Sequence, residues 1–240
     1  MRHSFSFLLL ILTLSFTSCR FNMGRKIEGN GNRQTKNYSI TDFTEVNVAG
    51  PMTVYITQGA GFSVKVEADE NLFDYLEIEK DGRELEIGSR SNYNLRSRGG
   101  IKVWVTAPTY EAAEIAGSGK IISETKITSS KDLQIDVAGS GDVQLDVDAP
   151  EIKADVAGSG NVLLTGATKE FSVDIAGSGD VRAFNLMSEV SKVDIAGSGN
   201  AEVSASRELD VDIAGSGNVV YKGNPNVKQS KMGSGKVRKG

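Results

Sequence analysis

Five aspartates recur at nearly constant spacing in the second half of the chain, each two residues before an alanine. They are Asp136, Asp155, Asp174, Asp194 and Asp212. If they lie in register on stacked strands, their carboxylates stand about 4.8 Å apart on an outward face. Such a ladder suits a cation or a basic partner. The simpler interpretation is a solvated acidic face that keeps a flat sheet soluble and discourages edge-to-edge association.

The same spacing raises the possibility of glycoside hydrolysis, because retaining glycosidases hold two carboxyl groups roughly 5–5.5 Å apart. A catalytic pair would be a local exception in a repeat, however, whereas these aspartates belong to the repeat itself. Between residues 111 and 220 the only aromatic side chains are Phe171 and Phe184, both at or near core positions. A carbohydrate-binding or polysaccharide-degrading β-helix protein that uses carboxylates is therefore the alternative rather than the preferred interpretation.

Other catalytic chemistry is restricted by composition. The only histidine is His3 and the only cysteine is Cys19. The chain beyond them lacks the residues of Ser-His-Asp and Cys-His nucleophiles and of ordinary zinc sites. We therefore predict no catalytic, cofactor-binding or metal site, and no enzyme.

One polar segment stands outside any repeat. Residues 89–100 carry Arg90, Tyr93, Arg96 and Arg98 among serines, asparagines and glycines. Long insertions on repeat proteins often form binding faces. The segment is either a solvated loop or a contact for an anionic glycan or lipid head group.

The N-terminus has the order of a secretory signal. Two basic residues precede an apolar run of about ten residues, which is too short for a permanent membrane span. The run leads to Cys19, and the segment 16–19 (Phe-Thr-Ser-Cys) resembles a bacterial lipobox. We expect residues 1–18 to be removed and Cys19 to carry the acyl chains that anchor the protein in a membrane.

The tetrapeptide Ala-Gly-Ser-Gly defines the repeat. Its alanines are Ala116, Ala138, Ala157, Ala176, Ala196 and Ala214. Between the tetrapeptides, apolar and polar residues alternate strictly, which is typical of strands with one buried face. The pattern predicts an all-β fold, a β-solenoid with coils of about 19 residues. Both glycines of each Gly-Ser-Gly fall at core positions, so we expect corners where the backbone bends or approaches the next coil closely.

The remaining segments are less regular. Residues 19–39 read as a lipidated, flexible tether and residues 223–240 as a basic tail, which places the domain at 40–222 and its repeats at 111–220. Asp81-Gly82 indicates a hairpin, and residues 70–76 are the one candidate for a helical turn. From 111 to 220 we count 19 acidic and 8 basic residues. This acidic balance and export disfavour nucleic acid as a partner.

The body of the chain resembles the head GIN domain family of autotransporter adhesins. The resemblance rests on residues 43–50 (Phe-Thr-Glu-Val-Asn-Val-Ala-Gly), on Thr57-Gln-Gly59, on Asp81-Gly82 followed by Leu85-Glu-Ile87, on Val105-Thr-Ala-Pro108, and on the serial Gly-Ser-Gly-Asn/Asp corners. It covers roughly residues 43–222 and implies a β-solenoid on a lipoprotein or surface protein.

These observations together predict a non-enzymatic cell-envelope lipoprotein that presents a rigid solenoid for adhesion or envelope contacts. We expect a membrane partner through the lipid on Cys19, in the outer membrane, and a glycan or envelope component as ligand. The sequence leaves the ligand, the membrane face and the oligomeric state open.

Overall fold

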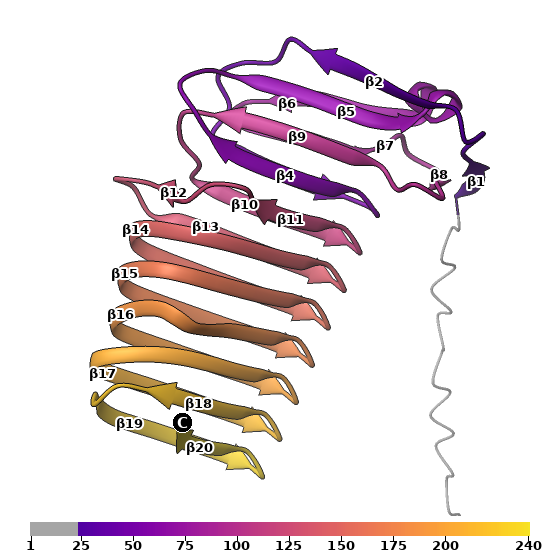
Figure 1. Ribbon diagram of the computed structural model, residues 1–240. Helices are drawn as coiled ribbons and strands as arrows, with labels where there is room; N and C mark the ends of the chain where they lie inside the picture. Colours follow the sequence, from indigo (N-terminus) through magenta and orange to yellow (C-terminus); the bar gives the residue numbers. More distant parts are fainter. Residues whose placement is uncertain (1–23) are drawn as a thin grey trace, which may run out of the picture.

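The computed structural model describes residues 24–240, so the predicted signal and Cys19 lie outside the described residues. From residue 112 onward the chain winds into stacked coils (Figure 1). Their strands are β10 (Ala112–Gly117), β11 (Lys120–Ser123), β12 (Ile127–Thr128), β13 (Leu133–Gly139), β14 (Asp142–Gly158), β15 (Asn161–Gly177), β16 (Asp180–Gly197), β17 (Asn200–Gly215), β18 (Asn218–Lys222), β19 (Asn226–Gly233) and β20 (Lys236–Lys239). The predicted all-β solenoid is confirmed, with about seven turns.

Each coil has two sides that join at the Gly-Ser-Gly corner, and every neighbouring pair of coils is parallel. On the side before the corner, β3, β10, β13, β14, β15, β16, β17 and β19 follow one another. On the side after it, the order is β4, β11, β14, β15, β16, β17, β18 and β20. The long strands β14 to β17 belong to both sides because they bend at the end opposite the corner.

Residues 24–110 build the start of the solenoid and cap it. The elements are β1 (Arg25–Glu28), β2 (Arg33–Tyr38), β3 (Glu45–Ala49), β4 (Thr53–Gln58), β5 (Ser63–Asp69), η1 (Glu70–Tyr75), β6 (Leu76–Asp81), β7 (Glu84–Ser89), β8 (Tyr93–Arg96) and β9 (Lys102–Ala107). Antiparallel strands β5 and β2 extend one side beyond β9, and β6 extends the other beyond β7. The expected hairpin at Asp81-Gly82 and the helical turn η1 are both present.

The core follows the predicted alternation. On β13, Leu133, Ile135 and Val137 are buried, and the residues stacked on Ile135 and Val137 in the next coil, Ala154 and Val156, are buried as well. Burial of one apolar face on each side of every coil is the main stabilising term of such a repeat.

The Gly-Ser-Gly corners stack directly, as the predicted close approach requires. Gly158 has a φ of +123°, and a Cβ built on it would overlap the carbonyl oxygen of Gly139 in the preceding coil. A Cβ on Gly160 would lie 2.5 Å from the carbonyl oxygen of Gly141. The placement of both glycines at core positions is only half right. The second glycine is buried, whereas Gly158 is partly exposed and its missing Cβ would point at the neighbouring coil.

The predicted flexible tether at 19–39 is wrong over its described part, because residues 25–38 contribute two strands. β1 pairs with β8, and β2 forms an antiparallel edge strand on β5. The side chains of β2 are mostly exposed. Backbone hydrogen bonds therefore hold it in place, and an edge strand of this kind leaves no apolar alternation in the sequence.

The predicted basic tail at 223–240 is likewise wrong, since β19 and β20 form a further coil that keeps the corner at Gly233-Ser234-Gly235. Gln229 and Lys231 stack on the buried Val211 and Ile213 but are themselves exposed. A terminal coil packs on one side only, so its core positions tolerate polar residues.

The corners that begin at Ala176 and Ala196 are 20 residues apart, one more than in the preceding coil. An irregularity in β16 accommodates the extra residue, and there the register shifts against both β15 and β17. Phe184 lies at this point and is only partly buried, with the Lys222 ammonium 4.3 Å from its ring centre. Phe171, the other ring expected in the core, is fully buried.

Candidate functional site

The aspartate column lies on the side of the solenoid before the corner. The strands are in register so that Asp136, Asp155, Asp174, Asp194 and Asp212 are successive partners. Each aspartate precedes a buried Val or Ile, and alternation therefore turns it outward. The predicted register and outward direction are confirmed. Glu114, the partner of Asp136 on β10, extends the column by one coil.

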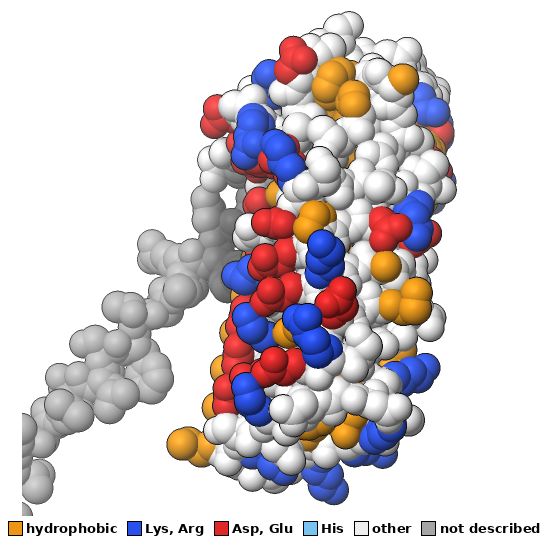
Figure 2. All heavy atoms as spheres, turned by 90° about the vertical axis from the view of Figure 1, so that its left-hand side faces the viewer, with side chains coloured by type: hydrophobic (Ala, Val, Ile, Leu, Met, Phe, Trp, Pro, Cys, Tyr) orange, Lys and Arg blue, Asp and Glu red, His pale blue; other side chains and the backbone are white. Residues whose placement is uncertain are grey.

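Three carboxylates of this column are harder to ionise than a free aspartate. Partial burial raises the pKa of Asp136, Asp174 and Asp194, and a neighbouring aspartate in the column raises each of them further. Lys153 is the local counter-charge: its Nζ lies 2.7 Å from Asp155 Oδ2 and 4.0 Å from Asp174 Oδ2. Figure 2 shows acidic side chains gathered along the solenoid with basic side chains beside them.

An open groove of about 640 Å³ runs along the column and is bordered by the exposed alanines that follow the aspartates. The carboxylates stand in line along it. Residues 24–240 contain no group of three or more His, Cys, Asp or Glu side chains arranged to hold a metal ion. The groove therefore offers a negative edge and a flat apolar edge, without a point at which ligands converge.

A second polar ladder lies on the other side of the corner, and in it asparagines separate the aspartates, which reduces the repulsion between carboxylates. Its members Asp142, Asn161, Asp180, Asn200 and Asn218 are also successive partners. Asn161 Nδ2 donates to Asp142 Oδ1 at 2.9 Å, and Lys120 Nζ lies 2.7 Å from Asp142 Oδ2. The Lys120 ammonium and the Asn161 amide lower the pKa of Asp142.

We expect Asp174→Asn and Asp142→Asn to change stability in opposite directions at pH 7. The raised pKa of Asp174 means that its ionisation destabilises the fold as the pH rises above about 4, so Asp174→Asn should add up to about 0.5 kcal/mol. The lowered pKa of Asp142 means that its ionised form stabilises the fold above about pH 4, so Asp142→Asn should cost about 0.5 kcal/mol.

Denaturant unfolding of both variants at pH 7 and pH 3 measures these effects. The gain from Asp174→Asn should vanish at pH 3, where both wild-type and variant side chains are neutral, and the loss from Asp142→Asn should shrink as the pH falls through the lowered pKa. A clear loss of stability for Asp174→Asn at pH 7 would show that its carboxylate is engaged by a stabilising partner.

The polar segment 89–100 forms a hollow at the cap. β8 pairs in parallel with β1, which places Arg96 opposite Glu28. The hollow has a volume of about 510 Å³. It is lined by Glu28, Gly29, Asn30, Gly31, Asp69, Arg96, Ser97 and Arg98.

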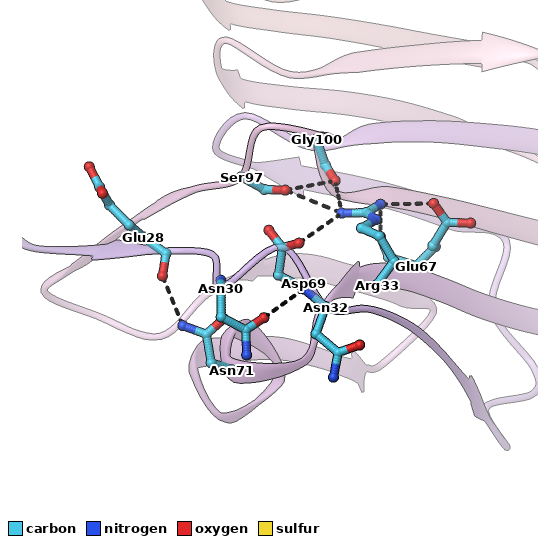
Figure 3. Close-up of polar contacts among 9 residues, drawn as sticks. All are labelled: Glu28, Asn30, Asn32, Arg33, Glu67, Asp69, Asn71, Ser97 and Gly100. Atoms are coloured by element: carbon cyan, nitrogen blue, oxygen red, sulfur yellow. Dashed lines mark hydrogen bonds and ion pairs between the residues drawn. The ribbon is translucent and has the colours of Figure 1, made fainter.

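Arg33 on β2 fixes the wall of this hollow (Figure 3). Its Nη1 donates to Gly100 O at 2.7 Å and to Ser97 Oγ at 3.2 Å. Its Nη2 donates to Glu67 Oε1 at 2.8 Å. One guanidinium thus ties the loop after β8 to strand β5, and it holds the backbone around Ser97 beside the hollow.

The opposite wall is held by Asn71. Its Nδ2 donates to the carbonyl oxygen of Glu28 at 2.8 Å, and its Oδ1 accepts from the Asn30 N–H at 2.8 Å. These bonds fix the chain on both sides of Gly29, where a Cβ would overlap the carboxylate of Asp69. Glycine is therefore required for the chain to pass this close to Asp69.

Asp69 is the most buried charge in the hollow, with a side chain 3% exposed. It precedes η1, the position of a capping residue, but its side chain makes no capping hydrogen bond. Its one ion-pair partner among residues 24–240 is Arg33, whose Nη1 lies 3.8 Å from Oδ1. Buried carboxylates normally accept several hydrogen bonds. No group of residues 24–240 donates one to the side chain of Asp69.

The structure divides the four residues singled out in segment 89–100. Arg96 and Arg98 line the hollow, whereas Arg90 does not and Tyr93 packs on Tyr75 with ring centres 4.7 Å apart. Sequence reasoning missed Asp69, Arg33 and Asn30. An aspartate at the end of an alternating strand, directly before a helical turn, reads as an ordinary cap, and residues 30–33 were assigned to the tether.

A family model described as "Putative auto-transporter adhesin, head GIN domain" matches residues 42–225. The chain belongs to the head GIN domain family. The resemblance read from the sequence is therefore confirmed over almost the whole domain. No curated protein matches the chain.

Several solved structures share the fold of this head GIN protein. A "putative adhesin" from Bacteroides fragilis superposes with a TM-score of 0.82 at 21% identity, covering 89% of this chain and 99% of its own. A "putative lipid binding protein" from Parabacteroides distasonis has a TM-score of 0.73 at 31% identity, covering 90% and 100%. A "putative adhesin" from the same species has a TM-score of 0.69 at 27% identity, with the same coverage.

Within residues 24–240, no helix combines the length and the apolar character that crossing a bilayer requires.

Proposed function

We propose that this head GIN protein is a non-enzymatic adhesive protein of the cell envelope, anchored by lipid on Cys19. The observation that carries the adhesive role is the family match over residues 42–225. A rigid, parallel solenoid suits this role because it presents side chains at fixed spacing along an extended surface. The anchor rests on the sequence, in which Cys19 follows a secretory signal at the position that a lipobox requires.

The arrangement of carboxylates favours binding over catalysis. Hydrolysis by a carboxylate pair needs two groups in different environments, one protonated and one ionised. The column instead repeats an aspartate on five successive coils, and burial and like charge raise the pKa of Asp136, Asp174 and Asp194 alike. A polysaccharide-degrading enzyme is thus the less favoured alternative.

A binding screen tests this function. Residues 20–240 would be applied to an array of glycans and envelope components and to lipid vesicles, the latter because a relative with 31% identity is described as lipid binding. We expect saturable binding to at least one component, and no shortening of any bound oligosaccharide on prolonged incubation. Release of cleavage products would instead support the enzymatic alternative.

A further inference from the structure

The hollow beside Asp69 has a chemistry that points to one class of ligand. We propose that it binds an acidic sugar, a saccharide unit that carries a carboxylate or a phosphate. This inference deepens the proposed adhesive function and rests on it. It concerns a different surface from the aspartate column, whose repeated carboxylates mark no single position along the groove.

The floor of the hollow, formed by the Asp69 carboxylate, is suited to binding neutral hydrogen-bond donors. The carboxylate of Asp69 is 3% exposed, and its one ion-pair partner among residues 24–240 is Arg33, at 3.8 Å. The Arg33 guanidinium donates its short hydrogen bonds to Gly100 and Glu67 instead. No group of residues 24–240 donates a hydrogen bond to the Asp69 carboxylate, so it can accept one from a sugar hydroxyl that reaches the floor of the hollow.

The rim of the hollow, formed by Arg96 and Arg98, is suited to binding an anion. Arg96 and Arg98 are exposed and line the hollow, and within residues 24–240 neither guanidinium forms an ion pair within 4 Å. Their positive charge does reach the hollow, because both contribute to lowering the pKa of Glu28, whose main partner is Lys26. Two unpaired guanidinium groups are well suited to bidentate hydrogen bonds with a carboxylate or a phosphate.

Simpler ligands fit this combination poorly. A bare anion would meet the carboxylates of Asp69 and Glu28, and a bare cation would meet Arg33, Arg96 and Arg98. An apolar ligand would bury these charges without satisfying them. An acidic sugar places hydroxyl donors and a negative group on one ring. The hollow, about 510 Å³, lies within the range of small-ligand sites, roughly 300–1,000 Å³.

The walls are already set for such a ligand. Arg33 holds the loop that contains Ser97, and Asn71 holds the chain on both sides of Gly29. A preorganised site loses less conformational entropy on binding than a mobile loop does. Ser97 and Asn30 also line the hollow with neutral polar side chains. The Ser97 hydroxyl is held by Arg33 and Gly100, and Asn30 Oδ1 accepts from the Asn32 N–H, so the side-chain NH₂ of Asn30 remains as a donor.

The test is calorimetric titration of the full chain in detergent. The probes are disaccharides containing glucuronate, galacturonate or mannuronate, each paired with its carboxyl-reduced form, and glucose 6-phosphate paired with glucose. We expect at least one acidic sugar to bind saturably and its neutral counterpart to bind about tenfold more weakly or worse. Absence of binding by every acidic sugar, equal binding of the neutral forms, or equally tight binding of inorganic phosphate would each overturn the proposal.

Variants locate the site. Arg96→Gln with Arg98→Gln should weaken binding of the acidic sugar by tenfold or more, while Arg90→Gln, in the same segment but outside the hollow, should leave it unchanged. Asp69→Asn should weaken the acidic and the neutral sugar alike. Because Asp69 is buried, the melting temperature of the Asp69→Asn variant is measured in parallel. If that variant unfolds, binding by the double variant of Arg96 and Arg98 decides the outcome. Unchanged binding by the arginine double variant would overturn the assignment.

These results are separable from the proposed function. A chain that binds another component on the array, but none of the acidic sugars, would keep its adhesive role and lose this site.

Discussion

Gly158→Ala should lower the free energy of unfolding by about 2–4 kcal/mol, although it adds a single methyl group at a partly exposed corner. Two costs add at this position. The φ of +123° lies in the region that L-residues avoid, and the new Cβ would overlap the carbonyl oxygen of Gly139. That carbonyl accepts the N–H of Ser159 at 2.7 Å, so it cannot retreat without breaking the ladder between coils.

Three other glycines separate these costs. Gly160→Ala should destabilise through overlap alone, because a Cβ there would lie 2.5 Å from Gly141 O while the φ is unremarkable. Gly31→Ala should show the backbone cost alone, since its φ is +81° and nothing lies within 4 Å of the added atom. Gly61→Ala meets neither problem and should stay within about 0.5 kcal/mol of the wild type. Denaturant unfolding of the four variants gives the comparison, and a Gly158→Ala variant as stable as Gly61→Ala would contradict stacked corners.

Cys19→Ala should abolish membrane anchoring completely. Each buried CH₂ of an acyl chain contributes about 0.8 kcal/mol, so the two or three chains that we propose on Cys19 would hold the protein stably, and the variant would lose them. Metabolic labelling with an alkynyl fatty acid should mark the wild-type chain and fail to mark the variant, which should move to the soluble fraction.

The neighbouring Ser18→Ala variant is the matched control, because it keeps a small side chain before the cysteine. It should retain both the label and the membrane association. Equal labelling of wild type and Cys19→Ala would show that the lipid is attached elsewhere or is absent.

The solenoid was predictable from sequence because burial imposes its pattern locally. Alternation in β13 to β17 distinguishes the inward Val137 from the outward Asp136, and the constant step between corners puts Asp136 and Asp155 in register. The close approach at the corner glycines was also predictable, since stacked coils exclude a Cβ from both positions of the motif, although only the second glycine is buried.

The edge strand β2 and the terminal coil escaped prediction because other forces hold them. β2 is stabilised by edge pairing with β5, and β19 packs on one side only, so neither needs an alternating apolar face. The hollow escaped for a further reason. Arg33, Asp69 and Arg96 are far apart in sequence and meet only through the pairing of β1 with β8 and of β2 with β5. No local sequence pattern predicts that these three residues lie close together.

The central claim, an anchored adhesive solenoid, is tested most directly by attachment of whole cells under flow. A host that lacks the protein would express the wild-type chain or Cys19→Ala, over surfaces coated with the components that the binding screen identifies. We expect cells with the wild-type chain to be retained well above the host alone, and cells with Cys19→Ala to fall to the level of the host. Retention of wild-type cells no better than that of the host would contradict the adhesive role, and equal retention with Cys19→Ala would contradict the anchor.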